Sequence, residues 1–232
     1  MERPIIFSAP MVRALLGGTK TQTRRVLKLV PPADADQVHT WFAPPHVPTE
    51  GIDNQWAESG LWAKKRGQTG YNRYVGALPY RPGDRLWVRE NWQLHGRAAD
   101  VCTVVYAASV NASWTEAHQQ FPDELAGSMR PRPFQEAWRP SIHLPRWASR
   151  ITLAVTDVRV ERLRAISEAD CWAEGVENCG EVDGGRSIPG HGRDLFRSLW
   201  NSINGPEAWD ANPWVVAVSF NVESPAQRGA EG

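Results

Sequence analysis

The segment from Gly18 to Arg25 holds the residues of this sequence that are best suited to chemistry. It reads Gly-Thr-Lys-Thr-Gln-Thr-Arg-Arg, so an amine, hydroxyl groups and two guanidinium groups follow, at fixed offsets, a glycine that is expected to end a helix. Such side chains can donate hydrogen bonds to ligand oxygens, most strongly when the donor is charged. A structural interpretation stays open, because threonine favours strands and the two arginines could form a solvated face.

The same segment resembles the signature of the ASCH family, Gly-x-Lys-x-x-Glu-x-Arg, with Gly18, Lys20 and Arg25 in register. Thr23 stands where the family signature has glutamate. Members of this family are small β-barrels that resemble PUA domains and handle RNA or nucleosides. The resemblance therefore implies a barrel fold and a nucleoside or RNA substrate.

Three further segments are similar to the family. They are the turn at Pro82 to Asp84 that leads into a strand, the stretch from Ile166 to Gly175, and the strand after Asn212. The resemblance covers roughly residues 1–30, 80–108 and 145–222, and it is closest to longer members from bacteria and their phages. The small members do not account for the segments in between.

One branch of the family, which hydrolyses N4-acetylcytidine, uses a lysine, a threonine three residues later and a glutamate in the late helix. On this sequence the resemblance assigns these roles to Lys20, Thr23 and Glu174. Amide hydrolysis needs a nucleophile, a base and a donor for the developing oxyanion. The resemblance implies that Thr23 supplies the hydroxyl, and that Lys20 is the base if burial lowers its pKa. Glu174 would orient Lys20 or pass the proton to the leaving amine.

The neighbouring residues are the expected substrate-binding groups. These are Thr21, Arg24 and Arg25, and Arg25 could hold a phosphate or a nucleoside oxygen. Two functions follow: an amidohydrolase that deacylates an N4-acylated cytidine, or a non-catalytic module that binds RNA or a modified nucleotide. A structural alternative stays open as well, because Lys20 and Glu174 could form a surface ion pair worth at most about 1 kcal/mol.

Local patterns predict the elements that must position these residues. Ser8 and Pro10 begin a helix that Gly17 and Gly18 end, and a strand follows over 19–26. The box from Ser167 to Asp170 begins a short helix that runs to Glu174 and stops at Gly175. Other predicted elements are strands at 85–92, 101–108, 150–163 and 214–222 and a helix at 194–203.

These elements predict an α+β fold, a small PUA-like β-barrel decorated by helices. A single domain is expected over residues 1–222, with a flexible tail at 223–232. Residues 31–80 and 109–145 are rich in proline and are expected to be long irregular insertions. The 12 tryptophans are expected to pack the barrel and its covering loops, although one or two could stack on a base.

The composition limits the classes of partner that we expect. Lys and Arg number 26 and Asp and Glu also number 26, so the global basic excess typical of proteins that grip long duplexes is missing. The three cysteines are too few and too loosely spaced for a disulfide framework, and no segment is apolar enough to cross a membrane. We expect a cytoplasmic protein that is a monomer or a weak dimer. Metal-binding motifs are missing from the sequence, so we expect no metal and no cofactor.

Overall fold

The computed structural model describes residues 1–32, 35–42, 60–65, 67, 69, 73–109, 113–132, 137–176 and 191–223. The chain divides into two compact units, each built from separate stretches of sequence. Unit 1 consists of residues 1–18, 85–154 and 222–232, and unit 2 consists of residues 19–84 and 155–221. The expectation of a single domain over residues 1–222 stays a prediction, and the tail at 224–232 lies outside the described residues.

Unit 1 starts with a parallel pair of strands that the sequence patterns did not predict. β1 (Glu2–Ile6) lies parallel to β6 (Arg85–Arg89), and the first residues of β10 (Thr152–Arg162) lie antiparallel on the other edge of β6. β1 is short and contains Pro4, which hides it from a pattern search. The predicted strand at 85–92 is therefore shorter than expected, because the chain leaves this sheet after Arg89.

The first predicted helix is confirmed as α1 (Ala9–Leu16). Ser8 occupies the N-cap position with extended backbone angles, although its side chain makes no capping hydrogen bond. Pro10 lies in the first turn, where its missing amide hydrogen costs nothing. Gly17 and then Gly18, with φ of 72°, turn the chain out of the helix and towards Lys20.

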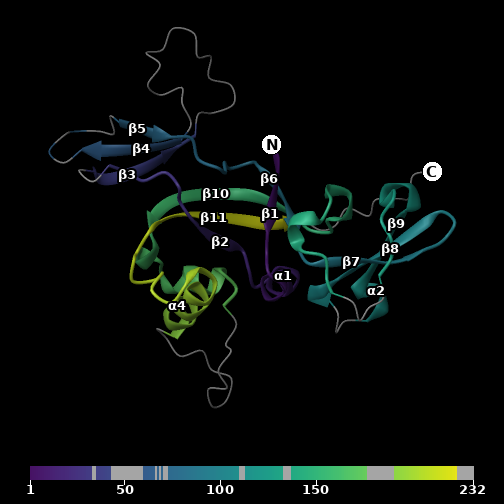
Figure 1. The fold of residues 1–232 in the computed structure, drawn as a ribbon. Coiled ribbons are helices and arrows are strands. Elements are labelled where there is room, and N and C mark those ends of the chain that lie inside the picture. Colours follow the sequence, from purple (N-terminus) through teal and green to yellow (C-terminus); the bar gives the residue numbers. More distant parts are fainter. Residues whose placement is uncertain are drawn as a thin grey trace, which may run out of the picture. The chain divides into compact units, whose positions relative to one another are not determined.

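The rest of unit 1 is an antiparallel meander of three strands (Figure 1), β7 (Trp92–Arg97), β8 (Val101–Tyr106) and β9 (His118–Pro122). Its core is a cluster of buried residues: Trp92, Leu94, Cys102, Val104, Tyr106, Ala126, Leu144 and Ala148. The short helices of the unit are α2 (Trp114–Ala117) and the 3-10 helices η2 (Ala107–Ser109), η3 (Asp123–Ala126), η4 (Ser141–His143) and η5 (Arg146–Ala148). The expectation that 109–145 is irregular is thus wrong at β9, which pairing with β8 stabilises although it contains no β-branched residue.

In unit 2, β11 (Trp214–Glu223) is the strand next to β2 (Gln22–Val26). The two are antiparallel, from Val215 opposite Val26 to Ser219 opposite Gln22. On its other side β11 neighbours β10, so the strand order in this unit is β10, β11, β2. The predicted strands at 150–163 and 214–222 are confirmed, whereas the one expected at 19–26 is regular only from Gln22.

A second sheet of unit 2 lies within the segment that was expected to be irregular. β3 (Ala35–Trp41), β4 (Gly60–Lys65) and β5 (Arg73–Gly76) form an antiparallel sheet in that order (Figure 1). Leu61, Trp62 and Ala63 are buried in succession, so β4 lacks the alternation that identifies a strand. The expectation of irregular structure over 31–80 is therefore wrong for these three strands.

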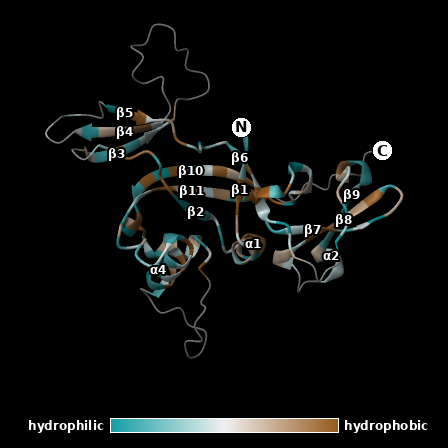
Figure 2. Cartoon of the chain, in the orientation of Figure 1, coloured by the Kyte–Doolittle hydropathy of each residue, from teal (hydrophilic) through white to brown (hydrophobic). Residues whose placement is uncertain are grey.

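Two helices complete unit 2 and confirm the predicted ones. α3 (Glu168–Ala173) follows the 3-10 helix η6 (Leu163–Ala165), and α4 (His191–Asn204) is longer than the 194–203 expected. Figure 2 shows that α4 contains both hydrophilic and hydrophobic residues, as an amphipathic helix does. Its apolar side chains join a buried cluster: Leu163, Ile166, Cys171, Phe196, Trp200, Trp209 and Val215.

The chain is thus a mixed α+β protein in which strands predominate. Five of the 11 described tryptophans are buried, namely Trp62, Trp87, Trp92, Trp200 and Trp209, whereas Trp114 is 62% exposed. A closed barrel is not found among the described strands of either unit. Within the described parts of the chain, no helix is long and apolar enough to cross a membrane.

Candidate functional site

The backbone of unit 2 brings Lys20 next to Glu174. The two residues form an isolated antiparallel bridge between the start of β2 and the end of α3. On one side the Thr21 amide donates to the Ala173 carbonyl at 2.8 Å, and on the other the Phe220 amide donates to the Thr21 carbonyl at 2.9 Å. The chain at Lys20 is therefore held between α3 and β11, so the backbone from which the Lys20 side chain extends has a fixed position.

The amine of Lys20 binds Glu174 through two oxygen atoms. Nζ donates to the Oε2 carboxylate oxygen at 3.0 Å and to the backbone carbonyl oxygen at 2.7 Å. Lys20 is fully buried and Glu174 is only 4% exposed, so the interpretation as a surface ion pair is wrong. The proximity of the two groups, expected from the resemblance, is found.

Burial controls the proton affinity of this amine. Loss of hydration lowers the pKa of Lys20 below its ordinary value, and the carboxylate of Glu174 only partly offsets this effect. The positive charges of Arg25 and Arg24 lower the pKa of Lys20 further. A lysine with a lowered pKa can be neutral at a pH where an exposed lysine is charged, which is what a general base requires.

Local sequence signals place Glu174. Ser167 caps α3 by accepting a hydrogen bond from the Asp170 amide at 3.1 Å, as the capping pattern predicts. The Glu174 amide donates to the carbonyl of Asp170 at 3.0 Å and so closes the last turn. Gly175 follows with a φ of 74°, a conformation that favours glycine and ends the helix.

Arg24 lies beside this pair and is 4% exposed, so it does not belong to a solvated face. Its guanidinium contacts Glu174 Oε1 at 3.1 Å and Gln22 Oε1 at 2.5 Å through Nη1. Through Nη2 it contacts Glu161 at 2.6 Å and Asp170 at 3.2 Å, and Nε also donates to Glu161 at 3.1 Å. These five contacts match the five N–H groups of an arginine, which argues against the expected substrate-binding role.

Thr23 is not hydrogen-bonded to this group. It lies in β2 opposite Val218 and is 2% exposed. Because side chains alternate along a strand, Thr23 points to the opposite face from Gln22 and Arg24. Within the described residues, its hydroxyl makes no hydrogen bond with Lys20 or Glu174. The structure thus joins Lys20, Arg24 and Glu174, and leaves Thr23 apart from them.

The two other expected substrate-binding residues differ in burial. Thr21 is exposed, whereas Arg25 is half-buried. Burial lowers the pKa of Arg25, while Tyr80 and Glu174 raise it. Arg25 therefore contributes a positive charge to the surroundings of Glu174 and Lys20.

Two carboxylates of the site escaped the sequence patterns. Glu161 on β10 binds Arg24 but has no motif around it. Asp170 was recognised only as part of the helix cap, although its side chain also contacts Arg24. A predicted pairing of β2, β11 and β10 would have been needed to bring these groups together.

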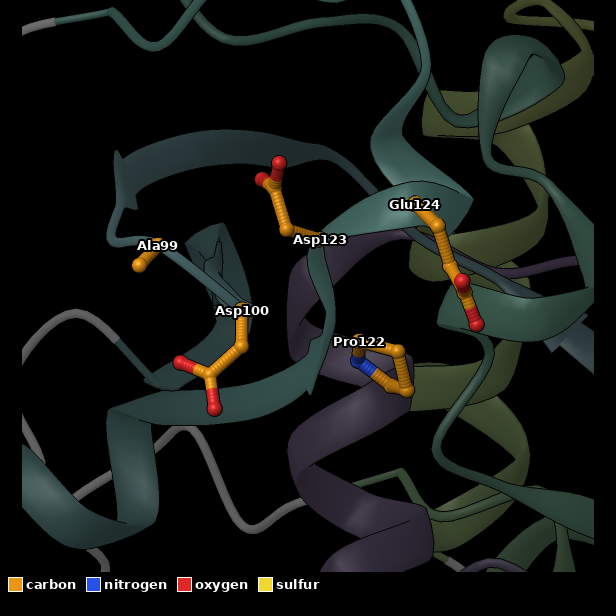
Figure 3. A pocket seen from close by; sticks show the side chains of 5 residues that line it. All are labelled: Ala99, Asp100, Pro122, Asp123 and Glu124. Carbon is orange, nitrogen blue, oxygen red and sulfur yellow. The ribbon is translucent and has the colours of Figure 1, made fainter.

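A pocket of about 490 Å³ lies in unit 1, lined by Ala99, Asp100, Pro122, Asp123 and Glu124 (Figure 3). Its three carboxylates point in different directions, so they do not converge on one cation. Asp123 is also paired with Arg97, whose Nε lies 2.5 Å away. No group of three or more potential metal ligands occurs among the described residues.

Comparison with known proteins adds no relatives. No protein family model matches the chain, and neither a curated protein nor a solved structure is significantly similar to it.

Proposed function

We propose that this protein is an amidohydrolase that removes the acyl group from the exocyclic N4 of a modified cytosine nucleoside, such as N4-acetylcytidine. The observation that carries this proposal is the Lys20 amine, which is fully buried and bound by Glu174. A buried amine with a lowered pKa is suited to accept a proton during amide hydrolysis. The pattern of lysine, threonine and glutamate resembles that of the corresponding ASCH branch.

The proposed reaction begins with proton transfer from a hydroxyl to neutral Lys20. The oxygen of Thr23 attacks the acyl carbon, the carbon–nitrogen bond breaks, and the N4 amine leaves with the proton that Lys20 returns. Water then hydrolyses the acyl ester on Thr23, giving the carboxylic acid and free threonine. Protonated Lys20 and Arg25 stabilise the negative charge on the acyl oxygen, and Glu174 orients Lys20.

This mechanism requires Thr23 to approach Lys20 when substrate binds. The present placement of Thr23 opposes this role, because its side chain lies on the opposite face of β2 from Arg24 and the strand is paired with β11 at this residue. A water molecule activated by Lys20 would serve as the nucleophile if Thr23 stays on the other face.

A second candidate function is a binding module for RNA or a modified nucleotide. The observation that favours it is the placement of Thr23, whose hydroxyl makes no hydrogen bond with Lys20 or Glu174. In that case Arg25 and exposed Thr21 bind the ligand, and the buried Lys20 and Glu174 give the site its shape.

The finer description of the fold belongs to the same proposal. A PUA-like barrel of the ASCH type is proposed from the resemblance alone, because the described strands β10, β11 and β2 have an open order. Cys102 and Cys171 are buried free thiols, which supports a cytoplasmic location. The proposed partner is a nucleoside or RNA, and the proposed oligomeric state is a monomer or a weak dimer.

The direct test is incubation with N4-acetylcytidine and related acyl nucleosides, with the deacylated nucleoside measured by chromatography. Product that forms with the wild type and not with Lys20→Ala supports the hydrolase. Saturable binding without product supports the binding module. Neither binding nor product with any acyl nucleoside or RNA leaves both proposals without support.

A further inference from the structure

A row of alternating charges runs from Lys20 to the surface of unit 2. Lys20 contacts Glu174 at 3.0 Å, Glu174 contacts Arg24 at 3.1 Å, and Arg24 contacts Asp170 at 3.2 Å. Asp170 in turn contacts Arg159 at 3.0 Å. The side chain of Lys20 is 1% exposed and that of Arg159 is 42% exposed, so the row links a buried amine to solvent.

We propose that Arg24 is a positioning residue, which holds the Glu174 carboxylate against Lys20 and couples Lys20 to the surface pair of Asp170 and Arg159. Only the catalytic consequence of this coupling rests on the proposed function. The coupling itself concerns the protein without substrate and can be measured separately.

The geometry of Glu174 gives the first reason. Its two carboxylate oxygens are divided between two cations, with Oε2 bound to Lys20 and Oε1 bound to Arg24. This division fixes the rotation of the carboxylate about its last bond. Without Arg24, the carboxylate could turn away from Lys20, while the backbone carbonyl of Glu174 would still accept from the amine.

The anchoring of Arg24 gives the second reason. Glu161, Asp170 and Gln22 hold its guanidinium, so it cannot follow a ligand or a moving Glu174. A guanidinium held on several sides supplies a charge with a fixed position. Charges in such a buried group are weakly screened, so a change at one member is felt at the next.

The charged groups that act on Lys20, either directly or through Glu174 and Arg24, include residues from three elements. They are Arg24 and Arg25 on β2, Glu174 and Asp170 on or next to α3, and Glu161 and Arg159 on β10. Their signs give a specific expectation. Glu174 raises the pKa of Lys20 more than Arg24 lowers it, so a carboxylate that turns away after the loss of Arg24 should lower the pKa of Lys20. Loss of Asp170 leaves Arg24 less neutralised and should lower the pKa of Lys20.

The test is a pH titration of the lysine side chains by NMR in protein labelled with carbon-13 at lysine Cε. The chain contains only four lysines, Lys20, Lys28, Lys64 and Lys65, so the Lys20 signal can be assigned from its absence in Lys20→Arg. We expect Arg24→Gln to move the Lys20 titration to lower pH, because Glu174 is no longer held against the amine, and Asp170→Asn also to move it to lower pH. Arg159→Gln should move it weakly to higher pH, because Asp170 then neutralises Arg24 more fully.

Arg162→Gln is the matched control, because Arg162 lies on the same strand as Arg159 and stacks on Trp214 at 4.4 Å instead of joining the row. It should leave the Lys20 titration unchanged. Equal shifts in Arg162→Gln and Arg159→Gln, or a shift of the Lys20 titration to higher pH in Arg24→Gln, overturn the proposal.

Arg24→Gln removes a buried charge and could prevent folding. The variants Asp170→Asn and Arg159→Gln change partly exposed side chains, so they keep the test decisive in that case. If the wild type deacylates nothing while Asp170→Asn and Arg159→Gln shift the Lys20 titration in opposite directions, the coupling stands and the proposed function fails. If the protein is an active hydrolase but the titrations do not move, the coupling fails and the proposed function stands.

Discussion

The amine of Lys20 donates to both the carboxylate and the backbone carbonyl of Glu174, so one residue supplies two acceptors for the same amine. The carbonyl is available because Glu174 ends α3 and has no further turn to bond with. The end of α3 therefore offers the amine a neutral acceptor, the carbonyl of Glu174, in addition to the charged carboxylate of the same residue.

Replacement of Lys20 by alanine should abolish deacylation and leave the fold intact. Glu174 keeps Arg24 as its counter-ion, so the variant does not leave an isolated buried charge. Loss of a positioned base typically lowers the rate by about 10²- to 10⁴-fold. Steady-state kinetics with N4-acetylcytidine, together with circular dichroism, separates lost catalysis from lost folding.

Glu174→Gln is the companion to that variant. The backbone carbonyl of residue 174 still accepts from Lys20, but the negative charge that raises the pKa of Lys20 is gone. We expect a smaller loss of turnover than in Lys20→Ala. A larger loss in Glu174→Gln would assign proton transfer to Glu174 instead of an orienting role.

The pH dependence of stability should report the buried amine. Because the pKa of Lys20 is lowered by burial, the unfolded chain binds its proton more tightly than the folded one. The resulting cost to stability is complete below the folded pKa and disappears as the pH rises towards the unfolded value of 10.5. Urea unfolding across that window should show stability rising with pH from this group.

Lys20→Met should flatten that rise, and Lys28→Met serves as the control because Lys28 is exposed. An identical pH dependence in wild type and Lys20→Met contradicts the lowered pKa.

Local signals were sufficient to predict the two ends of the central contact. The glycines after α1 indicated that the helix ends just before Lys20. The capping pattern with Gly175 indicated that the later helix ends at Glu174. Both depend on conformations that glycine or a capping serine prefers within a few residues. The sequence therefore predicted that Lys20 and Glu174 lie at element boundaries, and the resemblance predicted that they meet.

The features that the sequence patterns missed depend on contacts between segments that are distant in the sequence. Arg24 was expected to face a ligand, but its charge is taken up by Glu161 and Asp170, which arrive from β10 and α3. The strands β3, β4 and β5 were missed because the segment around them is rich in proline and glycine. In addition, consecutive residues of β4 are buried, so the strand shows no alternation of buried and exposed positions. Such strands are stabilised by their neighbours and not by their own pattern.

Unit 1 contains a buried ion pair that should be structural. Arg150 binds Glu90 through two parallel hydrogen bonds of 2.8 and 2.9 Å, and its guanidinium lies 4.2 Å from the centre of the Tyr106 ring. Arg150→Met would leave the Glu90 carboxylate buried without its cation, at a cost of about 3 to 5 kcal/mol. Urea unfolding should show this loss.

The double variant Arg150→Met with Glu90→Leu is the control for that experiment. It removes both charges, so it should recover most of the stability lost in the single variant. Recovery of little or none would assign the loss to packing around Arg150, including its contacts with Tyr106 and Ser109.

Variants of Thr23 separate a threonine nucleophile from an activated water molecule. If the Thr23 hydroxyl forms the acyl ester, Thr23→Ala should lose turnover about as completely as Lys20→Ala, since neither variant can begin the reaction. Thr23→Ser should keep part of the rate, because the hydroxyl remains. Thr19→Ala is the matched control, since Thr19 is exposed, lies on the same segment and has no assigned role. Mass spectrometry after rapid quenching should detect an acyl group on the peptide that contains Thr23. Turnover retained in Thr23→Ala but lost in Lys20→Ala would identify water as the nucleophile and would explain why Thr23 makes no hydrogen bond with Lys20.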